Sequence, residues 1–128
     1  MSNGDNHQVI LVVDDYDCNR ELLRMFLVAS GYNVIEASNG LEAVRIATST
    51  PPDLIIMDLG MPVMDGFSAV RLLREVPKVC EVPIVACTAY DTSTHRDQAM
   101  SVGFNEFLTK PIDFNQLNFL IDRFLKAA

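Results

Sequence analysis

Three carboxylates and a lysine follow short apolar segments of this sequence: Asp14 and Asp15, Asp58, and Lys110. Two negative charges about 4 Å apart repel by roughly 4 kcal/mol at an effective dielectric of 20, so clustered carboxylates need a proton or a cation. Hard oxygen ligands that leave room for water suit Mg²⁺ or Mn²⁺. The residues therefore predict an acidic pocket for a divalent cation and a phosphoryl group.

The segments that would position these residues alternate with longer stretches of helical period. Such alternation is typical of an α/β fold, in which helices cover both faces of a parallel sheet. Because parallel strands end along one edge, polar residues at the strand ends should meet there. The predicted strands are Val9–Val13, Asn33–Ala37, Leu54–Met57, Pro83–Cys87 and Asn105–Thr109.

Capping residues predict the helix boundaries. The predicted caps are Asp17 for the first helix, Asn39 with Glu42 for the second, Thr94 with Asp97 for the fourth and Asp113 with Gln116 for the fifth. The first helix should end at Ser30-Gly31 and the fourth at Gly103, while the third should open after Gly66 and end near Val76-Pro77.

Composition excludes several classes of function. The chain has 17 acidic and 10 basic residues, a net charge of −7, which disfavours nucleic acid as a partner. No signal-peptide pattern and no apolar run of about 18 residues are present, so we expect no membrane contact and a cytoplasmic protein. Three unclustered cysteines suit reduced thiols. The 128 residues predict one domain, with a flexible start over 1–7 and an ordered core over about 8–127.

With these motifs in this order, the chain resembles the receiver domain of bacterial two-component response regulators. The resemblance covers about residues 8–127. It implies a flavodoxin-like, doubly wound five-stranded sheet of order 2-1-3-4-5 with five helices and a site between strands one and three. It further implies that Asp15 and Asp58 bind Mg²⁺ directly, Asp14 through water, and Gly60 through its backbone carbonyl.

Asp58 is the candidate phosphoacceptor, because a carboxylate can form an aspartyl phosphate. Phosphoryl transfer needs neutralised equatorial oxygens, which a cation on one side and the Lys110 ammonium on the other supply. Thr88 would donate its hydroxyl to a third oxygen. The alternatives are a turn or cap pair for Asp14-Asp15, packing for Thr88, and a surface lysine at Lys110. The resemblance also implies a cis bond between Lys110 and Pro111.

A switch is implied at Thr88 and Phe107. In the family the threonine moves toward the phosphoryl group, and an aromatic three residues before the lysine turns inward. Phenylalanine lacks the hydroxyl of the tyrosine that many receivers carry, so we expect an inward rotamer even without phosphate. The alternative for Phe107 is an ordinary core aromatic.

The predicted partner face comprises the fourth helix, fifth strand and fifth helix. The fourth helix has few apolar anchors, namely Ala99, Met100 and Val102. It can therefore shift at low cost. Phe119 points away from the core stripe of the fifth helix, and a solvated His95 lies on the fourth. The alternative for Phe119 is a single exposed aromatic without a role.

The sequence thus predicts a phosphorylation-dependent switch rather than an enzyme with external substrates. A histidine kinase or histidine phosphotransfer protein would donate the phosphoryl group, and a downstream protein or a homodimer would receive the signal. Gly60 and Tyr90 place no obvious group to orient an attacking water, which predicts slow to moderate self-dephosphorylation. Two alternatives stay open: a receiver-like binding module that does not use phosphorylation, and a Mg²⁺-dependent aspartyl-phosphate phosphatase, for which Gly60 stands where a second acid is usual.

Overall fold

The computed structural model describes residues 8–61, 63–89 and 93–126, without the side chains of 93–95 and 126. The predicted flexible start, Tyr90 and the His95 side chain therefore lie outside the described residues. The strands are β1 Val9–Val13, β2 Asn33–Ala37, β3 Leu54–Asp58, β4 Ile84–Thr88 and β5 Glu106–Thr109. The helices are α1 Asp17–Ala29, α2 Gly40–Ser49, α3 Gly66–Leu73, α4 Ser93–Val102 and α5 Phe114–Ile121, which a π-helical turn, Asp122–Lys126, continues.

The five strands form one parallel sheet in the order β2-β1-β3-β4-β5. This confirms the predicted flavodoxin-like α/β fold. Every residue of β3 and β4 is buried, as expected for central strands covered on both faces. The edge strand β2 exposes Asn33 and Glu36. Some boundaries differ from the prediction by one residue, so that Asp58 and Thr88 are the last residues of their strands.

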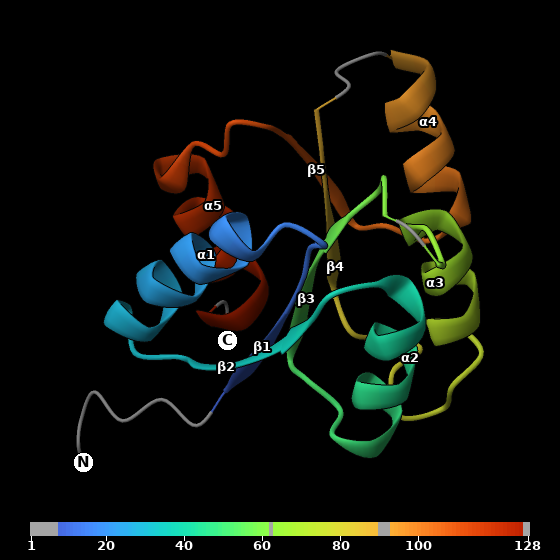
Figure 1. The fold of residues 1–128 in the computed structure, drawn as a ribbon, viewed down its shortest axis with the longest axis horizontal. Coiled ribbons are helices and arrows are strands. Elements are labelled where there is room, and N and C mark those ends of the chain that lie inside the picture. The colour runs from blue at the N-terminus through green and yellow to red at the C-terminus, as the bar shows by residue number, and fades with distance from the viewer. Residues whose placement is uncertain (1–7, 62, 90–92, 127–128) are drawn as a thin grey trace.

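Helices cover the sheet in two layers, with α1 and α5 on one face and α2, α3 and α4 on the other (Figure 1). Successive residues of β1 point to opposite faces, which is the period of a strand. Ile10 and Val12 pack in the cluster that includes α1 and α5, whereas Leu11 and Val13 pack in the cluster that includes α2, α3 and α4. Two apolar cores therefore hold the sheet, and Asp58 and Thr88, the last residues of β3 and β4, bring polar side chains to its carboxyl edge.

Two predicted caps are confirmed and two are wrong. The side chains of Asn39 and Asp113 accept hydrogen bonds from the first turns of α2 and α5. Asp17 is not a cap, because α1 starts after Tyr16 and the Asp17 carboxylate pairs with Arg20 instead. Thr94 lies inside α4, which already includes Ser93.

The end of α3 also differs from the prediction. The helix begins at Gly66 itself, with Asp65 as its cap, and ends at Leu73 rather than near Val76. Beyond it the chain continues in tighter turns, such as that from the amide of Val76 to the carbonyl of Leu73. Pro77 disfavours helical backbone at Val76, the residue before it, so the helix does not extend to the predicted end. The predicted ends of α1 and α4 are confirmed, because Gly31 and Gly103 have positive φ there.

Candidate functional site

The candidate site lies at the carboxyl edge of the sheet, between β1 and β3. These strands are neighbours although β2 comes between them in sequence, so the chain leaves β1 in one direction and β3 in the other. Such reversals open a crevice at the strand ends. Asp14 follows β1 and Asp58 ends β3, and Lys110 reaches the crevice from the end of β5.

Lys110 bridges two buried carboxylates. Its Nζ lies 3.2 Å from Asp14 Oδ2 and 3.1 Å from Asp58 Oδ2. Asp14 and Asp58 are 3% and 7% exposed, so these charges have little water to stabilise them. One ammonium thus compensates two acids in the core of the site.

Asp15 completes an acidic group with these two residues. One oxygen of each carboxylate, from Asp14, Asp15 and Asp58, lies within 4.8 Å of the others. Asp15 is exposed, which leaves that side of the group open to solvent. Hard oxygen donors with an open side fit Mg²⁺, which keeps part of its water shell. The donor set present therefore fits the predicted cation.

The balance of charge in the pocket appears in two pKa shifts. Burial raises the pKa of Asp58, and the nearby Asp14 charge adds to it; Lys110 and the amide of Gly60 lower it by less. Burial alone would lower the pKa of Lys110, but the charges of Asp58 and Asp14 raise it overall. Lys110 therefore stays charged, while the ionised form of Asp58 is under-compensated without a further cation.

The loop after β3 is held close to the site by two glycines. A Cβ at Gly66 would lie 2.7 Å from the carbonyl oxygen of Asp58, and one at Gly40 would lie 2.4 Å from that of Met64. Gly40 and Gly66 therefore permit the loop to return over β3 and dock on α2. Gly60 is different, since a Cβ there would meet nothing within 4 Å. The predicted ligand role of the Gly60 carbonyl stays a prediction.

Val63, in the same loop, has a φ of +69°. This left-handed conformation is unfavourable for a β-branched residue. The Val63 side chain is 77% exposed, so packing does not explain the conformation. The loop at the site thus carries local backbone strain.

Thr88 and Phe107 lie on neighbouring strands. Thr88 is buried at the end of β4, where its carbonyl accepts a 2.7 Å hydrogen bond from the amide of Lys110. Phe107 is 2% exposed, in the core below α4, and Arg96 of α4 lies 4.9 Å from its ring centroid. The aromatic side chain is thus inward, as expected; the switch roles of both residues stay predictions.

The predicted partner face is only partly described. Phe119 is 64% exposed on α5 and Met100 is 46% exposed on α4. Ala99 is buried and anchors α4. His95 belongs to α4, but its side chain lies outside the described part of the chain.

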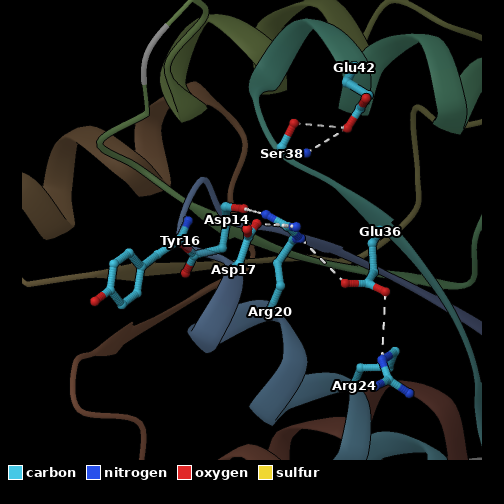
Figure 2. Close-up of polar contacts among 8 residues, drawn as sticks. All are labelled: Asp14, Tyr16, Asp17, Arg20, Arg24, Glu36, Ser38 and Glu42. Carbon is cyan, nitrogen blue, oxygen red and sulfur yellow. Dashed lines mark hydrogen bonds and ion pairs between the residues drawn. The ribbon is translucent and has the colours of Figure 1, made fainter.

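Arg20 is a residue near the site that the sequence analysis missed. Its guanidinium donates to the backbone carbonyl of Asp14 over 2.8 Å and pairs with Asp17 and Glu36 (Figure 2). Burial lowers the pKa of Arg20, but these carboxylates raise it by more. One sequence signal was available: a cation near a helix N-terminus opposes the helix dipole and so calls for a reason.

Comparison with known proteins agrees with this architecture. Residues 10–122 match the family model described as the response regulator receiver domain. An uncharacterized 14.6 kDa protein of Leptolyngbya boryana is 41% identical over 118 residues, which are 92% of this chain and 90% of that protein. In other curated relatives the matching region varies in its share of the relative's length: 7% in dokA of Dictyostelium discoideum, 23% in PleD of Caulobacter vibrioides and 84% in DivK of Brucella anthropi.

Two solved structures bear on the chemistry. The receiver domain of the Pseudomonas aeruginosa sensor histidine kinase PA1611, with a magnesium ion in its active site cleft, has a TM-score of 0.88 and 34% identity, over 95% of this chain and all of that one. The receiver domain of the Saccharomyces cerevisiae response regulator Ssk1 was solved in complex with the histidine phosphotransfer protein Ypd1. It has a TM-score of 0.86 and 31% identity, over 92% of this chain and 88% of that one.

Among the helices that the structure describes, none combines the length and the apolar character needed to cross a bilayer.

Proposed function

This chain belongs to the response regulator receiver domain family, and from that premise we propose that it is a signalling switch that accepts a phosphoryl group on Asp58. Members of the family are modules of two-component signalling rather than classical enzymes. We propose three things beyond membership of this family: that this chain is phosphorylated, which class of protein donates the phosphoryl group, and how the change is transmitted.

One observation carries the proposal. Asp58 lies at the reversal point of the sheet, with its Oδ2 atom 3.1 Å from Lys110 Nζ and its carboxylate within the acidic group of Asp14 and Asp15. A nucleophile, a fixed ammonium and a cation-binding donor set thus meet in one crevice. Phosphoryl transfer requires these three parts, because catalysis consists mainly of positioning and charge neutralisation.

In the proposed transfer, an oxygen of Asp58 forms a bond to phosphorus as the P–N bond of a phosphohistidine breaks. The imidazole leaves with the electron pair of that bond and then takes up a proton. Lys110 neutralises a phosphoryl oxygen, and the Thr88 hydroxyl donates a hydrogen bond to another. Asp15, Asp58 and the carbonyl of Gly60 would hold the cation directly, and Asp14 would hold it through water. Bound there, Mg²⁺ supplies positive charge to the phosphoryl oxygens.

The proposed response to phosphorylation involves Thr88, Phe107 and Arg96. A phosphoryl group shifts the equilibrium only by binding one packing arrangement better than another. Phe107 is already buried beneath Arg96, so phosphorylation would chiefly stabilise an existing inward arrangement and reposition α4. We propose that the exposed Phe119 and the face formed by α4, β5 and α5, including His95, transmit the change to a downstream protein or a second copy.

The donor that we propose is a histidine kinase or histidine phosphotransfer protein. The likeness to the Ssk1 receiver, which was solved with such a protein, supports this class. The single receiver domain over the 128 residues, with an ordered core over about 8–127, stays a prediction. Slow to moderate self-dephosphorylation also stays a prediction; it rests on the missing side chain at Gly60 and on Tyr90, which lies outside the described residues.

The test uses acetyl phosphate and intact mass. We expect the full chain to gain one phosphoryl group in Mg²⁺ and none in EDTA, and Asp58→Asn to gain none in either. Asp97→Asn, which changes an exposed aspartate of α4, is the matched control and should behave as the wild type.

Phosphorylation of Asp58→Asn to the wild-type extent would disprove the assignment of the acceptor. If the wild type gained nothing and beryllofluoride did not bind either, the phosphorylation-independent binding module would replace the switch. Turnover of a generic phosphate ester that disappears in Asp58→Asn would instead support the phosphatase.

A further inference from the structure

Arg20 connects three segments around the acidic pocket. It lies early in α1, and its Nη1 donates to the backbone carbonyl oxygen of Asp14 over 2.8 Å. Nη2 lies 2.5 Å from Asp17 Oδ1, and Nε lies 3.3 Å from Glu36 Oε1 on the edge strand β2. Figure 2 shows the side chain extended between Asp14 and Glu36. The guanidinium therefore joins the end of β1 to α1 and β2.

The carbonyl that Arg20 binds belongs to the peptide between the two neighbouring acids, Asp14 and Asp15. The amide of Asp14 is fixed by the carbonyl of Ala37, and its carboxylate accepts hydrogen bonds from the amide of Tyr16 and from Lys110. The hydrogen bond from Arg20 restrains the plane of the next peptide. Rotation of that plane would displace the exposed Asp15 carboxylate relative to Asp14.

The far end of the connection is itself well supported. Ala37, next to Glu36, accepts the hydrogen bond from the Asp14 amide over 3.2 Å. The following residue, Ser38, donates its amide to Glu42 Oε1 over 2.6 Å, so the start of α2 fixes this end of β2 (Figure 2). Arg20 thus ties the Asp14–Asp15 turn to an anchored strand end.

The helix dipole and the nearby cation site both oppose a positive charge at this position, and the ion pairs of Arg20 with Asp17 and Glu36 offset them. A cation near the start of a helix opposes the helix dipole. A fixed positive charge beside a cation site also lowers the affinity of that site. Geometry gives a reason for an arginine, because the planar guanidinium offers several donors in fixed directions.

We propose that Arg20 is a positioning residue for the divalent cation. It holds the Asp14–Asp15 peptide so that both carboxylates face the cation together with Asp58. The proposal rests on the cation site of the proposed function but not on phosphoryl transfer. Loss of a residue that orients metal ligands typically weakens metal binding about 10- to 100-fold.

The test measures the dissociation constant of Mg²⁺ by calorimetry on the metal-free full chain. We expect binding about 10-fold weaker in Arg20→Met than in the wild type. Arg24→Met is the matched control: it removes the same charge from α1 and a 3.7 Å contact with Glu36, but Arg24 has no contact with Asp14 among those found in the structure. Its constant should stay within about twofold of the wild type.

The sign of the change separates geometry from charge. Tighter binding in Arg20→Met would overturn the proposal, because the charge of Arg20 would then outweigh any positioning. Unchanged binding would overturn it as well, because the side chain would then not support the site. Equal weakening in both variants would overturn it too, since Arg20 contacts the Asp14 carbonyl and Arg24 does not. If the wild type bound no Mg²⁺, the cation site itself would fail, and with it this inference. If the wild type were phosphorylated but Arg20→Met bound Mg²⁺ as tightly as the wild type, only this inference would be overturned, and the proposed function would stand.

A second measurement separates positioning from stability. In the metal-free Arg20→Met chain, the order parameter of the Asp15 amide should fall from about 0.85 to below 0.6, while that of Val12 stays high. An unchanged Asp15 value would contradict the proposal. If Arg20→Met does not fold, Glu36→Gln on the edge strand replaces it in the test. This variant should weaken Mg²⁺ binding about threefold, which corresponds to the loss of one exposed ion pair. An unchanged Mg²⁺ affinity in Glu36→Gln would overturn the proposal.

Discussion

The two edges of the sheet surround a half-buried cation with opposite kinds of partner. At the amino edge, Arg74 donates to backbone carbonyls of Cys80, Val82 and Gly103 and to the side chain of Asn105. At the carboxyl edge, Lys110 faces two buried carboxylates, with a third acid beside them. The first set of partners is neutral and satisfies the donors; the second leaves excess negative charge.

The difference separates stability from function within one fold. Arg74 ties the end of α3 to the segments before β4 and β5, so its hydrogen bonds keep both strands in place. The carboxyl edge instead holds an under-compensated Asp58 and a strained Val63. Both are unfavourable for the unliganded chain, and both lie beside the proposed reaction centre, where strain and shifted pKa values concentrate.

The largest expected effect is on the amino edge. Arg74→Met should lower the free energy of unfolding by about 3 kcal/mol, because it leaves several partly buried acceptors without their donor. Urea unfolding measures this. The control Arg71→Met changes an exposed arginine of the same helix and should cost less than about 0.5 kcal/mol. A loss below 1 kcal/mol in Arg74→Met would show that the amino edge does not depend on this side chain.

The second prediction concerns the cation at the carboxyl edge. Mg²⁺ at 100 times its dissociation constant should stabilise the wild type by about 2.7 kcal/mol, since binding favours the folded state. Asp58→Asn, which removes one donor and the excess charge, should gain far less. Thermal unfolding with Mg²⁺ and with EDTA measures both. Equal gains in the two proteins would mean that the cation binds elsewhere, and the contrast between the edges would lose its functional meaning.

The sequence predicts the residues of the carboxyl edge more fully than those of the amino edge, for a physical reason. The acids and Lys110 follow apolar strand segments, and parallel strands bring such positions together. The strand order came from the family resemblance, because periodicity does not determine which strands are neighbours. Arg20 and Arg74 act through backbone carbonyls of distant segments, which leave no pattern of side chains in the sequence. The wrong cap at Asp17 has the same origin, since Arg20 competes for its carboxylate.

A smaller effect is expected at Val63. Val63→Gly should stabilise the chain by about 0.5–1 kcal/mol, because relief of a left-handed backbone, about 1–3 kcal/mol, outweighs the entropy cost of glycine. Loss of the Val63 side chain costs little packing, because that side chain is exposed. Val63→Ala loses the β-branch but keeps a Cβ at the unfavourable φ, so it should gain less than Val63→Gly; urea unfolding compares the three proteins. If alanine stabilised as much as glycine, the side chain rather than the backbone would be the source of the cost.

The smallest expected effect is a difference in pH dependence between the wild type and Asp58→Asn in EDTA. In the folded state, burial raises the pKa of Asp58 above its ordinary value of 3.8. At a pH between the ordinary pKa and the folded-state pKa, the folded state therefore binds more protons than the unfolded state. The stability of the wild type relative to Asp58→Asn should therefore fall as the pH rises from about 4 through the folded pKa and then level off. Lys110 stays charged throughout this range and contributes no slope. Urea midpoints at intervals of pH measure the difference. A wild type that gained stability over Asp58→Asn with rising pH would mean that Lys110 more than compensates the buried acid, and the carboxyl edge would then be as well satisfied as the amino edge even without a cation.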